Sequence, residues 1–124
     1  MDITPLVPED RQVINAYGDG GFRIAGQRWT GSVIVFPHRT ISWQPSRFVE
    51  VDAQGLEPVV QESGVQVLLL GCGLRAEWPS KELRGWLREK GVVVEPMDTG
   101  AAARTFNVML TEDRAVAAAL LAVE

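Results

Sequence analysis

The chain has 124 residues, a hydrophobic fraction of 46%, a charged fraction of 23% and a net charge of -4. These values are those of an ordinary soluble domain, and they exclude a disordered or fibrous chain. An acidic chain without clustered Lys and Arg does not match a phosphate backbone, so we expect no nucleic-acid partner.

The cysteine count and the lengths of the apolar runs exclude further classes of protein. The single cysteine, Cys72, excludes an internal disulfide and a cysteine-cluster metal site, and it is typical of a reducing compartment. No apolar run approaches the roughly 18 residues that cross a bilayer, and the opening "MDITPLVPED" has no signal-peptide pattern. We therefore expect a cytoplasmic protein that is not an integral membrane protein.

The N-terminal half is predicted to be rich in antiparallel β-structure. Residues 1–12 show neither a helix nor a strand period and are interpreted as a loose arm. After them, turn signals separate short β-rich runs at 14–17, 22–24, 31–36 and 41–43. These strands either join the sheet of the second half or form a layer beside it. A short helix is predicted at 54–62, with Pro58 in its first turn.

The second half alternates strands and helices. "VQVLLL" is a buried strand candidate, and "SKELRGWLREKG" is an amphipathic helix with Ser80 as N-cap, Gly91 as C′ residue and Trp86 among its inward residues. "VVVE" is a second strand, and Thr99 is the expected N-cap of a second helix. The ending 115–121 is alanine-rich, which favours helix, but a short apolar run after a polar turn is typical of a buried parallel strand. We predict a strand.

The predicted fold class is α/β. A β-α-β-α-β pattern implies parallel strands joined by right-handed crossovers, with helices covering the sheet. Together with the antiparallel N-terminal half, this predicts one three-layer domain over 1–124 with a central mixed sheet.

Three stretches carry a family resemblance: "YGDGGFRIAGQRWTGSVIVFP", "LLLGCG" and "ELRGWLREKGVVVEPMDTGAAARTFNVMLTEDRAVAAAL". Together they resemble a small family that is known mostly as a domain of unknown function. Its eukaryotic branch includes the mitochondrial NADH:ubiquinone oxidoreductase complex assembly factor 3. The match covers roughly residues 13–121, and its most specific elements are "GGFRI", the "GSV-V-P" run, the glycine pair after the central strand and the "MDTGAA-RT-N" motif.

The resemblance implies a compact three-layer α/β domain without an established enzymatic activity. For the mitochondrial branch it implies a role in assembling a respiratory complex together with a partner assembly factor. This chain shows no evident mitochondrial presequence, so we expect a stand-alone, bacterial member. The family commonly has threonine where this chain has Cys72, which argues against a required cysteine chemistry.

The candidate ligand site lies where two predicted strands end. Gly71 and Gly73 follow the first parallel strand, and Asp98, Thr99 and Gly100 follow the next. Ligands in open α/β sheets lie beyond these strand ends, and the first amides of a helix can bind an anion. The alternative is structural: the glycines form tight turns and Thr99 only caps its helix. The spacing matches no nucleotide-binding loop.

Arg104 follows this turn in the second helical turn, where a cation gains nothing from the helix dipole. We expect Asn107 to share its exposed face, so both side chains could present donors to an anion or to an acidic partner surface. The alternative is an internal ion pair of Arg104 with Asp98 or Glu95.

We predict no catalytic residues, because a pair of Cys72 with the single histidine, His38, would lack a third residue to orient it. We also predict no metal site, because one histidine and scattered carboxylates have no metal-ligand spacing, and no cofactor. Trp29 and Trp78 are candidates for a contact surface, for self-association or for another protein. The leading hypothesis is a non-catalytic binding or assembly module. The alternative is a protein that binds a small molecule or anion at the crevice formed by 71–73 and 98–104, including an enzyme of unknown activity.

Overall fold

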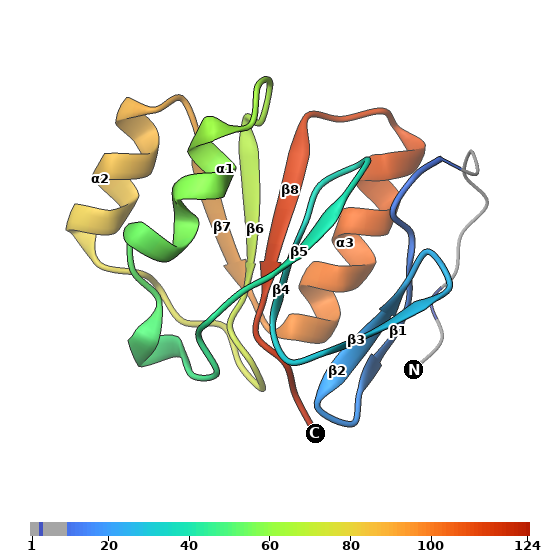
Figure 1. Ribbon diagram of the computed structural model, residues 1–124. Coiled ribbons are helices and arrows are strands. Elements are labelled where there is room, and N and C mark those ends of the chain that lie inside the picture. Colours follow the sequence, from blue (N-terminus) through green and yellow to red (C-terminus); the bar gives the residue numbers. More distant parts are fainter. Residues whose placement is uncertain (1–2, 4–9) are drawn as a thin grey trace.

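The computed structural model describes residue 3 and residues 10–124. The predicted loose arm, 1–12, therefore lies largely outside the described residues. The described chain forms a five-stranded and a three-stranded sheet, with helices on both faces of the larger one (Figure 1).

The larger sheet is mixed and has the strand order β5-β4-β8-β6-β7. β6 pairs in parallel with β7 on one side and with β8 on the other, while β4 pairs antiparallel with both β8 and β5. The predicted central mixed sheet is thus confirmed. Its strands are β4 (Val33–Val35), β5 (Thr40–Ser42), β6 (Val67–Gly71), β7 (Val93–Met97) and β8 (Val116–Leu120).

The alanine-rich ending is a strand, as predicted. All five residues of β8 are buried, because β8 lies between β4 and β6 with both of its faces covered. A strand in this position needs apolar side chains on both faces, and this demand overrides the helix propensity of alanine.

The smaller sheet is antiparallel, with the order β1 (Ile14–Gly18), β2 (Gly21–Ile24) and β3 (Gln27–Thr30). Two-residue turns join these strands, and both residues of each turn have positive φ: Asp19 with Gly20, and Ala25 with Gly26. Such turns match the twist of a hairpin. β3 was not predicted as a strand, because most of its side chains are exposed and it carries no apolar alternation.

The helices complete three layers (Figure 1). α1 (Glu57–Gln61) and α2 (Lys81–Glu89) cover one face of the larger sheet, together with the 3-10 turns η1 (Phe48–Glu50) and η2 (Gln54–Leu56). α3 (Thr99–Thr111) and the small sheet cover the other face. The N-terminal half therefore combines the two predicted alternatives: β4 and β5 join the large sheet, and β1 to β3 form a separate layer.

α2 begins and ends as predicted. The Ser80 side chain accepts a hydrogen bond from the Leu83 backbone N–H at 3.1 Å, and Gly91 has a φ of 83° just after the helix. Trp86 packs against the core on this face but is only partly buried, in contrast to Leu87, which is fully buried.

Candidate functional site

The loops that follow β6 and β7 lie side by side. Gly71 and Met97 are partners at the ends of the two strands. Beyond them the Cys72 N–H donates to the Met97 carbonyl at 2.8 Å, and the Leu121 N–H donates to the Gly71 carbonyl at 2.9 Å. The structure thus brings together the two loops of the predicted crevice, and backbone hydrogen bonds connect them to the end of β8.

Thr99 joins these loops through buried hydrogen bonds. Its N–H donates to the Gly73 carbonyl at 2.8 Å, and its hydroxyl donates to the Leu121 carbonyl at 2.7 Å. The same hydroxyl accepts a hydrogen bond from the Gly73 N–H at 3.0 Å. Thr99 is fully buried, so its polar atoms stabilise the fold by joining these loops.

The prediction that Thr99 is the N-cap of α3 is wrong by one residue. Asp98 is the N-cap, with extended backbone angles, and its carboxylate accepts from the Ala101 N–H at 2.8 Å. Aspartate is among the residues that cap helices best, and the Thr99 hydroxyl is already engaged across the loops.

The glycines of the predicted site allow close packing. A Cβ added at Gly71 would lie 2.9 Å from Leu120 Cδ2 and 3.1 Å from Thr99 Cα. A Cβ added at Gly100 would lie 2.5 Å from the Tyr17 hydroxyl oxygen. Gly73 has a φ of 98°, which favours glycine at this turn. Protein atoms therefore fill the space beside Gly71 and Gly100 that a ligand would have to enter.

Asn107 does not share an exposed face with Arg104, contrary to the prediction. It is buried, and its side-chain oxygen accepts from the Ile14 N–H at 2.9 Å. Its amide nitrogen donates to the carbonyls of Ile14, at 2.9 Å, and Ile3, at 3.1 Å. The carboxamide therefore replaces a strand partner for Ile14, at the point where the pairing of β1 with β2 is irregular.

Arg104 is exposed, and its guanidinium donates to the Tyr17 hydroxyl at 3.2 Å. Within residues 3 and 10–124, no carboxylate pairs with it, so the alternative of an internal ion pair with Asp98 or Glu95 is not seen there. Of the predicted set, Arg104 is exposed and Gly73 and Asp98 are partly exposed, while Gly71, Thr99, Gly100 and Asn107 are buried.

We expect Arg104→Ala to change the free energy of unfolding by less than about 0.5 kcal/mol, because an exposed side chain with one long hydrogen bond contributes little. Urea denaturation measures this. A loss above about 2 kcal/mol would assign Arg104 to the scaffold.

Cys72 is a buried thiol. Its sulfur lies 3.4 Å from the Leu70 carbonyl oxygen and 3.5 Å from that of Glu77, and burial raises the pKa of the Cys72 thiol. His38 is exposed, with its ring 3.9 Å from the Asp10 carboxylate. Desolvation outweighs the backbone hydrogen bonds at Glu77 and Met97 that favour the thiolate, so the described surroundings keep Cys72 protonated rather than activate it.

We expect iodoacetamide to label Cys72 at least about tenfold more slowly in the native protein than in urea at about pH 8, because burial limits access and disfavours the thiolate. Mass spectrometry over time measures both rates. Equal rates would show that the loop after β6 opens readily.

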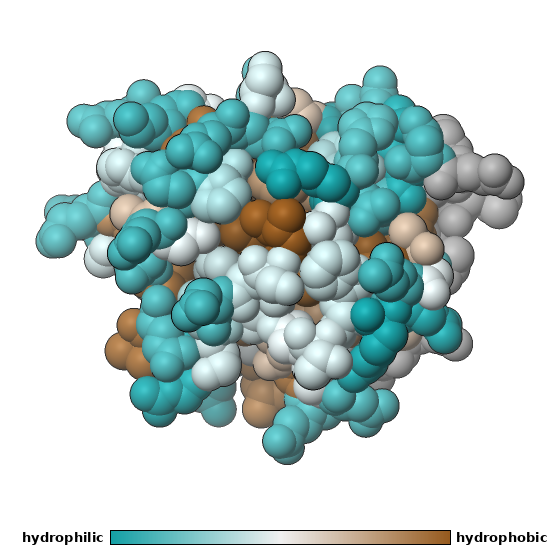
Figure 2. Space-filling view, in the orientation of Figure 1, coloured by the Kyte–Doolittle hydropathy of each residue, from teal (hydrophilic) through white to brown (hydrophobic). Residues whose placement is uncertain are grey.

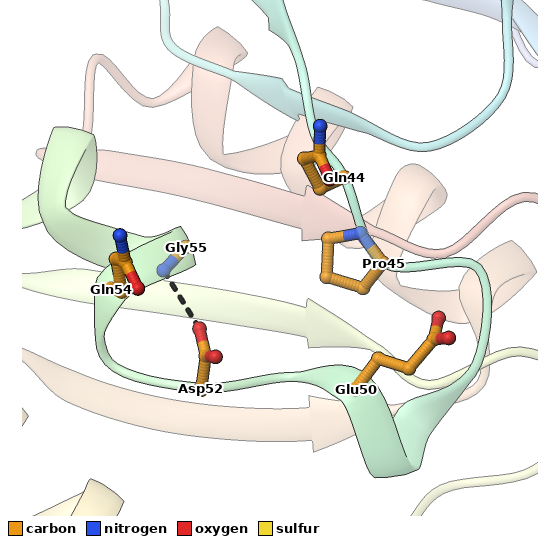
Figure 3. Close-up of a pocket in the computed structure, with 6 residues that line it drawn as sticks. All are labelled: Gln44, Pro45, Glu50, Asp52, Gln54 and Gly55. Carbon is orange, nitrogen blue, oxygen red and sulfur yellow. Dashed lines mark hydrogen bonds between the residues drawn. The ribbon is translucent and has the colours of Figure 1, made fainter.

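A separate cavity of about 540 Å³ lies between the loop after β5 and the turn before α1 (Figure 3). The Glu50 carboxylate accepts from the backbone N–H groups of Ser46 and Arg47, which holds the pKa of Glu50 below its usual value. Asp52 accepts from the Gly55 N–H at 2.8 Å. The sequence analysis missed this cavity, which is lined by Gln44, Pro45, Glu50, Asp52, Gln54 and Gly55.

Trp43 lies next to this cavity. Its ring is buried, and its indole N–H has no hydrogen-bond partner among the described residues. A Cβ added at Gly55 would lie 3.2 Å from this nitrogen. An unpaired buried donor costs about 1 to 3 kcal/mol relative to the same group in water.

We expect Trp43→Phe to cost less than about 1.5 kcal/mol, because removing the unpaired N–H offsets part of the lost ring packing. Urea denaturation measures the loss, with Trp43→Ala as the control for removing the whole ring. A loss close to that of the alanine variant would show that the indole N–H has a partner, such as a bound water.

Comparison with known proteins identifies the family of this chain. Residues 14–121 match the model of a protein family of unknown function (DUF498/DUF598). The chain belongs to this family. An uncharacterised protein of Rhodobacter capsulatus is 38% identical over 110 residues, which cover 87% of this chain and 82% of that protein.

A second relative is an assembly factor by name. The NADH dehydrogenase (ubiquinone) 1 alpha subcomplex assembly factor 3 of Xenopus tropicalis is 32% identical over 109 residues, which cover 87% of this chain and 60% of that protein. The chain thus spans about three fifths of the length of this assembly factor. The predicted family resemblance is confirmed.

A solved structure shares the fold. A protein of Bartonella henselae described as an outer membrane protein is 43% identical, with a TM-score of 0.86, and the match covers 94% of this chain and 98% of that one. In the described part of our chain, every helix is too short or too polar to cross a lipid bilayer.

Proposed function

We propose that this chain is a non-catalytic protein-binding module with a role like that of an assembly factor. Its support is the match to the assembly factor of Xenopus tropicalis together with an exposed apolar surface. Val49, Leu74 and Trp78 expose 77%, 88% and 70% of their surface. Exposed large apolar side chains that lie together mark protein contact sites.

These side chains lie on neighbouring segments. Figure 2 shows apolar surface at the lower left, over the segment of η1, and at the lower edge, over the loop that follows β6. A groove of about 190 Å³ joins the two segments, with Val49 on one side and Pro79 on the other. Trp78 directly precedes Pro79, and aromatic residues are enriched in protein interfaces.

The predicted crevice supports the alternative less well. The hydroxyl of Thr99 and the N–H of Gly73 bond to one another, and the carboxamide of Asn107 is buried against β1. For this alternative we propose Asp98 and Arg104, which are less enclosed, as the residues that contact a small anion. A cytoplasmic location, suggested by the single cysteine, belongs to the same proposal.

Co-purification and thermal shift together test the proposed function. We expect a stable protein partner to co-purify with the tagged chain, and no compound of a metabolite panel to raise the melting temperature. Saturable stabilisation by an anion or a nucleotide, without a protein partner, would favour the small-molecule alternative.

A further inference from the structure

A basic groove lies beside the free edge of the large sheet. It has a volume of about 220 Å³ and is lined by Trp78, by Arg84 and Arg88 of α2, and by Val92, Val93 and Val94. Trp78 exposes 70% of its surface and Val93 exposes 58%. The lining thus combines apolar surface with two positive charges and contains no carboxylate, although the chain as a whole is acidic.

The two arginines differ in how they are held. The Arg84 Nε donates to the Pro79 carbonyl at 3.1 Å, and its guanidinium carbon lies 5.4 Å from the centre of the Trp78 ring. This cation–π contact fixes the indole against α2. Arg88 lies one helical turn further and is exposed, and its guanidinium makes neither a hydrogen bond nor an ion pair within the described chain.

The backbone of β7 adds a donor to the same groove. The Val93 N–H donates to the Gln66 carbonyl and the Met97 carbonyl accepts from Cys72, so residues 93, 95 and 97 face β6. Because a strand's hydrogen-bonding groups alternate in direction, the N–H of Val94 points away from β6 at the free edge. Pro96, the next outward residue, has no N–H, so a complete added strand cannot pair here.

We propose that this groove binds a short, acidic segment of a partner protein, with an apolar side chain against Trp78 and carboxylates toward Arg84 and Arg88. The Val94 N–H then donates to a carbonyl of that segment. The two arginines favour an acidic partner by charge complementarity. The exposed indole favours a segment that also carries an apolar residue, and a small inorganic anion has no such group. This inference rests on the proposed protein-binding function.

Photo-crosslinking tests the groove in the full chain. We would introduce p-benzoylphenylalanine at position 78 or 93, irradiate the tagged protein in an extract of its native cells, and identify the crosslinked peptide by mass spectrometry. Position 108 is the matched control, since Val108 is 55% exposed on α3, on the other face of the sheet. We expect an acidic peptide at 78 and 93 and none at 108.

Charge substitutions decide whether the arginines recognise the partner. We expect Arg88→Glu to lower the crosslink yield at position 93 about tenfold, Arg88→Lys to keep most of it, and added salt to lower it further. Arg88 is exposed, so circular dichroism should show that both variants keep the fold.

The outcomes separate this inference from the proposed function. If no position captures a protein, both fail. If a protein is captured only at position 108, or if the captured peptide is not acidic, the chain binds proteins but not through this groove. An Arg88→Glu variant with an unchanged yield would also overturn the inference. Binding to anionic lipid vesicles that is lost in Arg88→Glu would assign the groove to a membrane surface instead and overturn it as well.

Discussion

Asn107→Ala should cost about 3 to 5 kcal/mol of the free energy of unfolding, which is among the largest losses for a polar residue. Its carboxamide accepts from the Ile14 N–H and donates to the Ile14 carbonyl, both at 2.9 Å. Ile14 is fully buried, so water cannot replace the lost partner. Each unpaired backbone group then costs about 1 to 3 kcal/mol, and the truncated side chain adds a cavity. Urea denaturation measures the total.

Two control variants separate hydrogen bonding from packing. Val108→Ala changes the next residue of α3, which is 55% exposed, and should cost less than about 1 kcal/mol. Asn107→Leu keeps most of the volume but still leaves Ile14 unpaired, so its loss should stay close to that of the alanine variant. A leucine variant as stable as the wild type would contradict the hydrogen-bonding role.

Most of the fold was predictable because the local sequence patterns favour the same helices and strands that tertiary packing requires. The α2 cap at Ser80 and the C′ glycine Gly91 are local signals, and the structure confirms both. β8 was predictable from the length and apolarity of the run. β3 was not, because a strand at the edge of a small sheet exposes its side chains and its sequence, "QRWT", has no alternation of apolar and polar residues.

The orientation of Asn107 was not predictable from α3 alone. Helical spacing predicts one buried face, but α3 is covered both by the large sheet and by β1, so its buried arc is wider than an amphipathic pattern suggests. The second cover comes from residues about 90 positions away in the sequence. Nothing in "ARTFNVML" indicates that Asn107 faces this second cover while Arg104 faces solvent.

The two loops of the candidate site meet as predicted, but the orientations of their side chains were not predictable. The ends of β6 and β7 meet, as a parallel sheet requires, yet whether a crevice there is open depends on side chains from other segments. Tyr17 covers Gly100, and Thr99 bonds to both neighbouring loops. In the same way, the groove of Trp78 and Arg88 joins a loop, a helix and a strand edge, so it could be found only in the structure.

Thr99→Val tests the scaffold role of the predicted site residue, and it should cost about 2 to 4 kcal/mol. Valine keeps the shape of threonine but removes the hydroxyl. The Gly73 N–H and the Leu121 carbonyl, now 3.0 Å and 2.7 Å from that hydroxyl, then lose this partner. Because Thr99 and Leu121 are buried, water does not reach the Leu121 carbonyl without local opening, whereas Gly73 is partly exposed. Urea denaturation measures the loss.

Thr99→Ser is the matched control, since it keeps the hydroxyl and removes only the methyl group, at a cost of about 1 kcal/mol. A scaffold that depends on the hydroxyl therefore requires the serine variant to be more stable than the valine variant. The reverse order would show that the methyl group, packed among the ends of β6, β7 and β8, contributes more than the two hydrogen bonds. In that case apolar packing, rather than the two hydrogen bonds, would hold the loops together.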